Sequence, residues 1–212
     1  GWQEYFVAHE DMPMLYKIRP VGVPLQAYLG AAGMTGRTAY FGLLNVGKPQ
    51  AGETVVVSAA SGAVGGIVGQ IAKQQDCRVV GVAGGADKCQ YVVEKLGFDA
   101  CVDYKAGALE GDLAAACPAG IDVYFENVGG KVLEAVFPLM NPHGRIPLCG
   151  MIAWYNAGGF HSLPWLELLD IRKWPKSQQS ASASASASAS ASAAAPPTTT
   201  SSVPSQSAAV FE

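Results

Sequence analysis

A regular alternation of short apolar runs and longer helical patterns, between residues 53 and 150, constrains the fold of this chain most. Residues 54–58 are centred on three valines, which is typical of a strand buried on both faces. Residues 63–75 follow with apolar side chains at helical spacing. Strict alternation of strands and helices favours right-handed crossovers and a parallel sheet covered on both faces. The sequence therefore predicts an α/β fold with a doubly wound parallel sheet.

The other predicted elements continue this alternation of strands and helices. In a parallel sheet, ligands bind beyond the carboxyl ends of the strands, so residues that directly follow a strand are candidates for function. Upstream, residues 2–8 are predicted as a strand, residues 12–24 as a loop with three prolines, and residues 25–44 as two helices separated at residues 30–36. Within the alternating region we predict strands at residues 54–58, 78–83, 100–103, 121–126 and 144–149, and helices at residues 63–75, 87–96 and 131–140.

Composition and charge exclude several classes of protein. The formal net charge is −3 and the basic residues are scattered, so no nucleic-acid partner is expected. The five cysteines lie far apart without a CxxC pair, which predicts no metal site and indicates buried thiols in a reducing compartment. Residues 54–72 are uncharged, but serines and glycines interrupt them, so no membrane span is expected. His9, His143 and His161 are isolated and are not predicted to act as bases.

The turn after the first valine-rich strand is rich in glycine. Residues 58–66 read SAASGAVGG, in which Gly62 and Gly65 match the last two glycines of G-x-G-x-x-G and Ala60 replaces the first. Gly62 lets the backbone approach a pyrophosphate, and Gly65 lets the helix pack closely on the strand. Free amides at the start of the helix then hold the phosphates. The pattern also fits a close-packed turn without a ligand, but its place in a βαβ unit favours a dinucleotide.

The end of the second strand indicates which dinucleotide binds. A site for NADH commonly has a carboxylate there, which binds the ribose hydroxyls. Residues 82–85 contain no carboxylate, and Lys88 follows at the start of the next helix. A cation at this position would pair with a 2′-phosphate, which favours NADPH over NADH. Lys88 could equally be a solvated helix residue on spacing alone.

Five motifs in a fixed order carry a resemblance to a known family. They are GMTGRTAY (residues 33–40), AASGAVG (59–65), GGADKC (84–89), DVYFENVGG (122–130) and CGMIAWYN (149–156). Together they resemble the medium-chain dehydrogenase/reductase superfamily. More narrowly, they are similar to its zinc-independent branch of prostaglandin reductases, or leukotriene B4 dehydrogenases, which are NADPH-dependent alkenal/enone double-bond reductases. The resemblance covers about residues 2–156 and implies a Rossmann-like sheet.

This resemblance implies an enzyme that reduces the C=C bond of α,β-unsaturated ketones and aldehydes with NADPH. Lys88 would bind the 2′-phosphate, and Tyr104 would also touch the adenosine phosphate. Tyr155 would lie nearest the enone and stabilise the enolate oxygen, although an aromatic packing role beside Trp154 remains the alternative. The other implied cofactor contacts are Gly62, Ala63, Val64 and Gly65 at the pyrophosphate, Asn127 by the ribose or nicotinamide, and Cys149, Gly150, Met151, Ile152 and Tyr155 along the nicotinamide ring.

The sequence departs from the family at both ends. Only the trailing strand of the GroES-like substrate domain is expected, in residues 1–24, before a dinucleotide-binding domain at residues 25–156. Residues 157–176 diverge from the family, and residues 177–212 form an Ala/Ser-rich tail with too little apolar surface to fold. An inactive NADPH-binding module and a truncated product without function are therefore alternatives. The resemblance also implies a small enone or enal substrate, a homodimer and a cytoplasmic location.

Overall fold

The computed structural model describes residues 4–9, 11–12, 17–18 and 22–155 of the 212. The chain divides into two compact units, Gly1–Leu169 and Asp170–Glu212, and every described residue belongs to the first. The segments predicted as a divergent piece (157–176) and as a disordered tail (177–212) lie outside the described residues.

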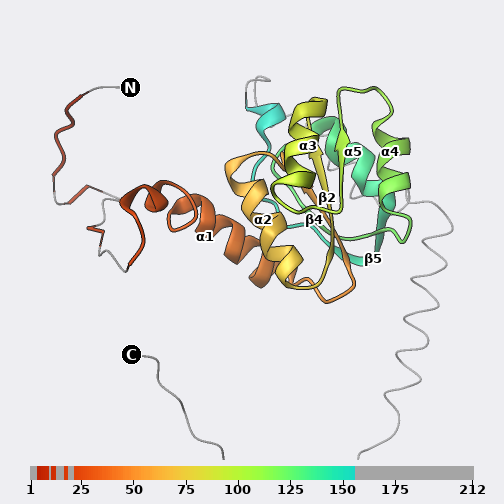
Figure 1. Ribbon diagram of the computed structural model, residues 1–212, viewed down its shortest axis with the longest axis horizontal. Coiled ribbons are helices and arrows are strands. Elements are labelled where there is room, and N and C mark those ends of the chain that lie inside the picture. The colour runs from red at the N-terminus through yellow and green to blue at the C-terminus, as the bar shows by residue number, and fades with distance from the viewer. Residues whose placement is uncertain (1–3, 10, 13–16, 19–21, 156–212) are drawn as a thin grey trace, which may run out of the picture. The chain divides into compact units, whose positions relative to one another are not determined.

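Five parallel strands form the centre of the described fold (Figure 1). Their spatial order is β3-β2-β1-β4-β5, so β1 lies in the middle and the chain crosses the sheet between β3 and β4. This is the predicted doubly wound sheet, and four of its five strands lie within one residue of the predicted bounds. The strands are β1 (Thr54–Ser58), β2 (Arg78–Ala83), β3 (Ala100–Asp103), β4 (Ile121–Phe125) and β5 (Met140–Arg145).

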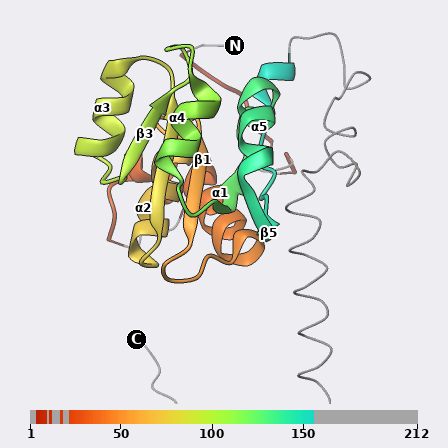
Figure 2. The same ribbon diagram turned by 90° about the vertical axis from the view of Figure 1, so that its right-hand side faces the viewer.

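Helices cover both faces of this sheet (Figures 1 and 2). Because side chains alternate along a strand, Val55 and Val57 of β1 point into one core and Val56 into the other. The first core contains residues of α1 (Met34–Phe41), α2 (Ala63–Gln74) and α3 (Ala86–Glu94). The second contains residues of α4 (Leu109–Ala116) and α5 (Gly130–Val136). Burial on both faces explains why these strands are apolar throughout.

Short helical turns complete the fold. The predicted helix pair at residues 25–44 consists of η1 (Leu25–Leu29), α1 and the π-helical turn η2 (Gly42–Gly47), with a shorter interruption than predicted. The predicted helix at residues 131–140 ends early, because α5 gives way to the 3₁₀ turn η3 (Phe137–Leu139) around Pro138. A last 3₁₀ turn, η4 (Ile152–Trp154), closes the described chain. Helix α4 was not predicted from the sequence.

Two strand predictions were wrong. Within the predicted strand at residues 2–8, residues 4–8 form no strand, and Tyr5 and Val7 are 87% and 81% exposed. The described chain offers this segment no strand to pair with, and β-propensity alone does not form a ladder. The last strand lies at Met140–Arg145, not at residues 144–149, and only the bridge from Glu126 to Leu148 continues it. Pro147 has no N–H group, so it cannot donate to the ladder there.

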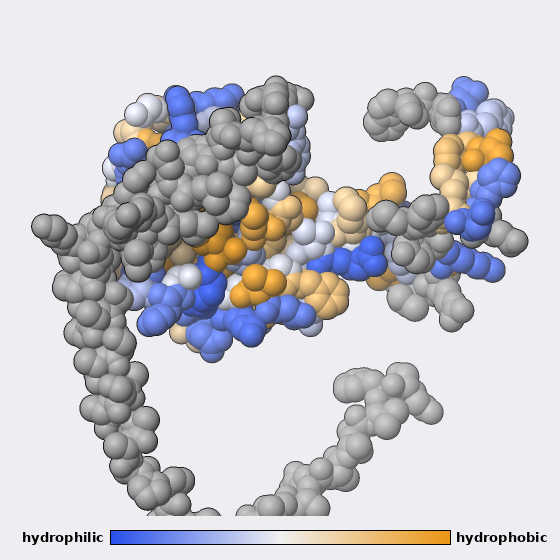
Figure 3. Space-filling view, turned by 180° about the vertical axis from the view of Figure 1, so that it is seen from behind, coloured by the Kyte–Doolittle hydropathy of each residue, from blue (hydrophilic) through white to orange (hydrophobic). Residues whose placement is uncertain are grey.

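Some apolar surface remains uncovered. Phe41, Val46 and Leu148 are each more than half exposed. Figure 3 shows hydrophobic residues gathered in the middle of the face seen from behind, with hydrophilic residues around them. None of the described helices has the length and apolar character that crossing a bilayer requires.

Two helix glycines provide a matched test of core packing. A Cβ at Gly69 in α2 would collide with the buried ring of Phe98, whereas a Cβ at Gly111 in α4 meets nothing within 4 Å. We expect Gly69→Ala to lower the free energy of unfolding by about 1–3 kcal/mol through overpacking. Gly111→Ala should raise it by up to about 1 kcal/mol, because alanine favours a helix. Urea unfolding followed by circular dichroism measures both, and equal effects would contradict the predicted packing.

An ion pair ties the loop before β1 to the end of β5. Arg145 donates from Nη1 to Glu53 Oε1 at 2.9 Å, and its Nε donates to the Gly47 carbonyl. The hydrogen bond from Arg145 holds the pKa of Glu53 below its ordinary value of 4.5. A lowered folded-state pKa contributes stability above the unfolded-state value, and this contribution disappears as pH falls through the folded-state value.

Glu53→Gln should therefore reduce the free energy of unfolding by about 1–2 kcal/mol at neutral pH. The difference between the variant and the parent protein should shrink towards zero below pH 4.5, the ordinary value for this carboxyl group. Chemical unfolding over a series of pH values measures it. A difference that stays constant through the acid range would show that the ionised carboxylate contributes nothing.

Candidate functional site

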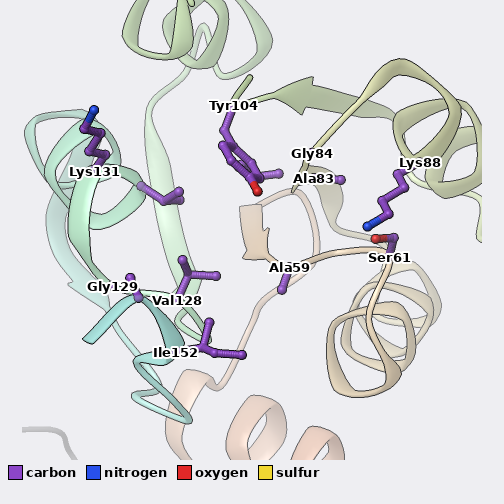
Figure 4. Close-up of a pocket in the computed structure, with 13 residues that line it drawn as sticks. Ala59, Ser61, Ala83, Gly84, Lys88, Tyr104, Val128, Gly129, Lys131 and Ile152 are labelled. Carbon is purple, nitrogen blue, oxygen red and sulfur yellow. The ribbon is translucent and has the colours of Figure 1, made fainter. Parts of the chain in front are cut away.

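A pocket of about 460 Å³ opens at the carboxyl ends of β1, β2 and β4 (Figure 4). This is where a doubly wound sheet binds its ligand, because the strand order reverses between β1 and β4. Its walls come from the turn after β1, the end of β2, the start of α3, the residue after β3, and the loop between β4 and α5. The described residues that line it are Ala59, Ser61, Val82, Ala83, Gly84, Lys88, Tyr104, Val128, Gly129, Lys131, Val132, Ile152 and Ala153.

The turn after β1 is tight. Ala59 adopts a left-handed conformation, with φ of 49°, and its carbonyl accepts from the Gly62 amide at 2.9 Å. Any side chain at Gly65 would collide with the Ala59 carbonyl, which is the close packing that the glycine pattern predicts. Gly62 and Ala63 line a smaller neighbouring cavity with Ser61, whereas Val64 packs on the first core. At the start of α2 the turn therefore presents backbone, whereas Ala59 and Ser61 before it line the pocket.

The ends of β2 and β3 form the next wall. The Tyr104 ring lies against Gly84, where a Cβ would come within 2.7 Å of it. Asp103 fixes this arrangement, since its Oδ1 accepts from the Gly85 amide at 2.8 Å and the Lys105 amide at 2.9 Å. These two amides hold the pKa of Asp103 below its ordinary value. Backbone amides thus bind the Asp103 carboxylate. Figure 4 shows the Tyr104 hydroxyl reaching into the pocket.

The charged side chains of the pocket are basic. Lys88 extends from α3 with its amine turned towards the Ser61 hydroxyl (Figure 4). Lys131 lines the opposite wall, with its amine pointing away from the pocket. The described lining includes no Asp or Glu. Lys88, two hydroxyl groups and a glycine-rich turn make a donor set that suits a phosphate-bearing cofactor.

A buried carboxylate shapes the wall that follows β4. Glu126 is fully buried, and its Oε1 accepts from the Val128 amide at 2.6 Å, the Gly129 amide at 2.9 Å and the Ser58 hydroxyl at 3.1 Å. Ser58 in turn binds Asn127, accepting from its backbone amide through Oγ and from its side-chain amide through the carbonyl oxygen. Burial, and then the Glu126 charge, raises the pKa of the neighbouring Tyr124 phenol.

The segment from Cys149 to Tyr155 folds back over this loop. The Cys149 amide donates to the Glu126 carbonyl, and the Ala153 amide donates to the Val128 carbonyl. This places Ile152 at the rim of the pocket. Tyr155 is 62% exposed, and its hydroxyl accepts from the Met151 amide at 3.3 Å. Tyr155 is therefore an exposed side chain with an anchored hydroxyl, and it is Trp154 beside it that packs on the second core.

The structure brings part of the predicted site together. Lys88, Tyr104 and Ile152 line the pocket, Gly62 and Ala63 line the smaller neighbouring cavity, and Val64 and Gly65 line neither. Asn127, Cys149, Gly150, Met151 and Tyr155 lie on or beside the adjoining loop and do not line it. Four other lining residues were not predicted as site residues: Ser61, Gly84, Gly129 and Lys131. The position of Ser61 directly before Gly62 was the one available signal, because a residue in this turn faces the ligand side.

No cysteine is among the described residues that line the pocket. All five cysteines are free, and burial raises the pKa of both Cys77 and Cys117 to about 11. In the part of the chain that the structure describes, no three His, Cys, Asp or Glu side chains gather where they could hold a metal ion. The prediction that the chain binds no metal stays a prediction.

Comparisons with known proteins match this architecture. The family described as zinc-binding dehydrogenase matches residues 63–173. A 2-alkenal reductase (NADP(+)-dependent) of Nicotiana tabacum is 50% identical over 170 residues, which are 77% of this chain and 48% of the relative. Prostaglandin reductase 1 of Mus musculus is 52% identical over 161 residues, which are 75% of this chain and 49% of the relative. The chain spans about half the length of the curated relatives it matches.

A solved structure agrees with these relatives. CurA from Vibrio vulnificus, crystallised in complex with NADPH, is 57% identical and superposes with a TM-score of 0.62, over 63% of this chain and 40% of that chain. The resemblance carried by the five motifs is thereby confirmed. The chain belongs to the zinc-binding dehydrogenase family, in the zinc-independent enone reductase group of the medium-chain dehydrogenase/reductase superfamily.

Proposed function

We propose that this chain forms the cofactor-binding part of an oxidoreductase that uses NADPH to reduce the C=C bond of small α,β-unsaturated ketones and aldehydes. The observation that carries the proposal is that Lys88 and Tyr104 both line the pocket, with no carboxylate among its described lining residues. Such a lining favours a phosphate over ribose hydroxyls. The names of the relatives support the reaction, since one is a 2-alkenal reductase and another is a structure with NADPH bound.

In this proposal, different walls of the pocket bind different parts of NADPH. The backbone amides of Ala63, Val64 and Gly65 at the start of α2 hold the pyrophosphate, and Gly62 beside them lets it approach the backbone. Lys88 and Tyr104 hold the 2′-phosphate of the adenosine. Asn127 and the segment of Cys149, Gly150, Met151 and Ile152 border the nicotinamide side, where backbone hydrogen bonds to the end of β4 keep them in place.

Tyr155 supplies the polar group for the reaction. Bound NADPH would donate a hydride to the β-carbon of the enone, which makes the carbonyl oxygen an enolate. Because the Tyr155 oxygen accepts from the Met151 amide, its own O–H proton remains free to donate. A hydroxyl donor aimed at a developing oxyanion lowers the barrier. We assign Tyr155 as the catalytic residue on this ground.

The remaining assignments are proposals of the same kind. We propose that residues 25–156 form the dinucleotide-binding domain and that residues 1–24 are the trailing part of a GroES-like substrate domain. A cytoplasmic location agrees with the five free thiols, since reducing compartments keep cysteines unpaired. Formation of a homodimer agrees with the position of β5 at the edge of the sheet, where its outer side meets no further strand of the described chain.

Lys88 should decide the choice of cofactor. We expect the parent protein to bind NADPH more tightly than NADH. Lys88→Ala should lower the affinity for NADPH by about 10- to 100-fold and leave the affinity for NADH nearly unchanged, because only NADPH carries the 2′-phosphate. Lys95→Ala is the matched control, since Lys95 follows α3 and does not line the pocket. Fluorescence titration with each nucleotide measures the affinities. Equal losses for both cofactors would contradict the assignment of Lys88.

Tyr155 should affect turnover and not cofactor affinity. Removal of the hydroxyl in Tyr155→Phe should lower the rate of enone reduction by about 100-fold, the cost of one oxyanion donor. The affinity for NADPH should stay within twofold of that of the parent protein, roughly the scatter expected for an uninvolved side chain. Oxidation of NADPH in the presence of an enone reports the first quantity, and fluorescence titration reports the second. An unchanged rate would remove Tyr155 from the mechanism.

A further inference from the structure

The turn after β1 holds Ser61 in a defined position above β2. The Ala60 amide donates to the Val82 carbonyl at 3.0 Å, which ties the turn to the neighbouring strand. The Gly62 amide donates back to the Ala59 carbonyl at 2.9 Å, which closes the turn on the other side of Ser61. Hydrogen bonds on both sides therefore fix the backbone from which the Ser61 side chain projects.

From this position the Ser61 hydroxyl faces Lys88. Figure 4 shows the Ser61 oxygen and the Lys88 nitrogen pointing towards each other across one side of the pocket, one from the turn after β1 and the other from α3. The Lys131 amine points away from the pocket, so it is not turned towards this corner. Asp103, the carboxylate that ends β3, is taken up by the amides of Gly85 and Lys105.

Resting on the function proposed above, we propose that Ser61 is a specificity-determining residue, whose hydroxyl binds the 2′-phosphate of NADPH together with Lys88. A serine hydroxyl both donates and accepts, so it can accept from the Lys88 ammonium and donate its proton to a phosphate oxygen. The lysine alone supplies a charge with little directional preference, whereas the fixed hydroxyl adds a second donor with a defined direction. The pair thus selects a phosphate at this corner of the pocket.

The test separates the 2′-phosphate from the rest of the cofactor. Isothermal titration calorimetry of the whole chain uses 2′,5′-ADP, which carries the 2′-phosphate, and 5′-AMP, which lacks it. Ser61→Ala should lower the affinity for 2′,5′-ADP by about tenfold, the contribution of one hydrogen bond to a charged group, and leave the affinity for 5′-AMP unchanged. Ser61→Thr keeps the hydroxyl and should restore most of the affinity, which serves as the matched control.

Two further variants sharpen the result. Ser61→Asp places a carboxylate beside Lys88, which should pair with the ammonium and repel the phosphate. The affinity for 2′,5′-ADP should fall by at least about 100-fold, and 5′-AMP should still bind. In the double variant Ser61→Ala with Lys88→Ala, the two losses should not add, because both side chains bind one group. Retained binding of 5′-AMP shows in each case that the variant is folded.

Each of the other possible results of these titrations contradicts either the role of Ser61 or the assignment of NADPH. If Ser61→Ala binds 2′,5′-ADP as the parent protein does, the role of Ser61 is wrong, while a parent preference for 2′,5′-ADP over 5′-AMP leaves the proposed function intact. If Ser61→Ala weakens both nucleotides equally, Ser61 shapes the turn and does not select the phosphate. If the parent protein itself shows no preference, the assignment of NADPH is overturned, and the inference falls with it.

Discussion

One buried carboxylate holds together the end of the sheet on which the site is built. Glu126 gathers the Val128 and Gly129 amides and the Ser58 hydroxyl on a single oxygen, so the ends of β1 and β4 are joined through side chains as well as through the ladder. Its backbone then receives the Cys149 and Gly150 amides, which draws the last described segment over the same loop. The three hydrogen bonds to Oε1 offset part of the cost of burying this carboxylate, whose Oε2 has no hydrogen-bond partner in the described chain.

The pocket follows from the topology that this network completes. Because β1 lies between β2 and β4, the helices after β1 and β2 cover one face of the sheet, and those after β3 and β4 cover the other. A crevice remains where the two sets part, and the turns that border it contribute backbone amides, hydroxyl groups and lysines. The apolar strands supply rigidity, and the chemistry comes from residues just beyond their ends.

The sequence predicts the parts of this molecule that depend on local pattern. Strands β1, β2 and β3 have the bounds that their apolar runs indicate, because burial on both faces leaves an unbroken signal. Lys88 was predicted from its spacing and Tyr104 from the family resemblance, and both line the pocket. Ser61 was missed, because its orientation towards Lys88 arises only when the turn and α3 are placed in space. The last strand was misplaced, because Pro147 interrupts a pairing that hydropathy alone suggests.

Gly84 and Tyr104 form a pair that evolution can alter only in concert. The phenol ring fills the space beside Gly84, so a larger residue at position 84 would collide with the ring. A smaller residue at position 104 alone would lose the contact that the phenol ring makes with Gly84. An acidic residue at the end of the second strand, the usual partner of ribose hydroxyls, is thereby barred while the tyrosine stays. Among descendants of such a protein, substitutions at these two positions should therefore occur together, because each change alone either crowds the ring or removes its contact.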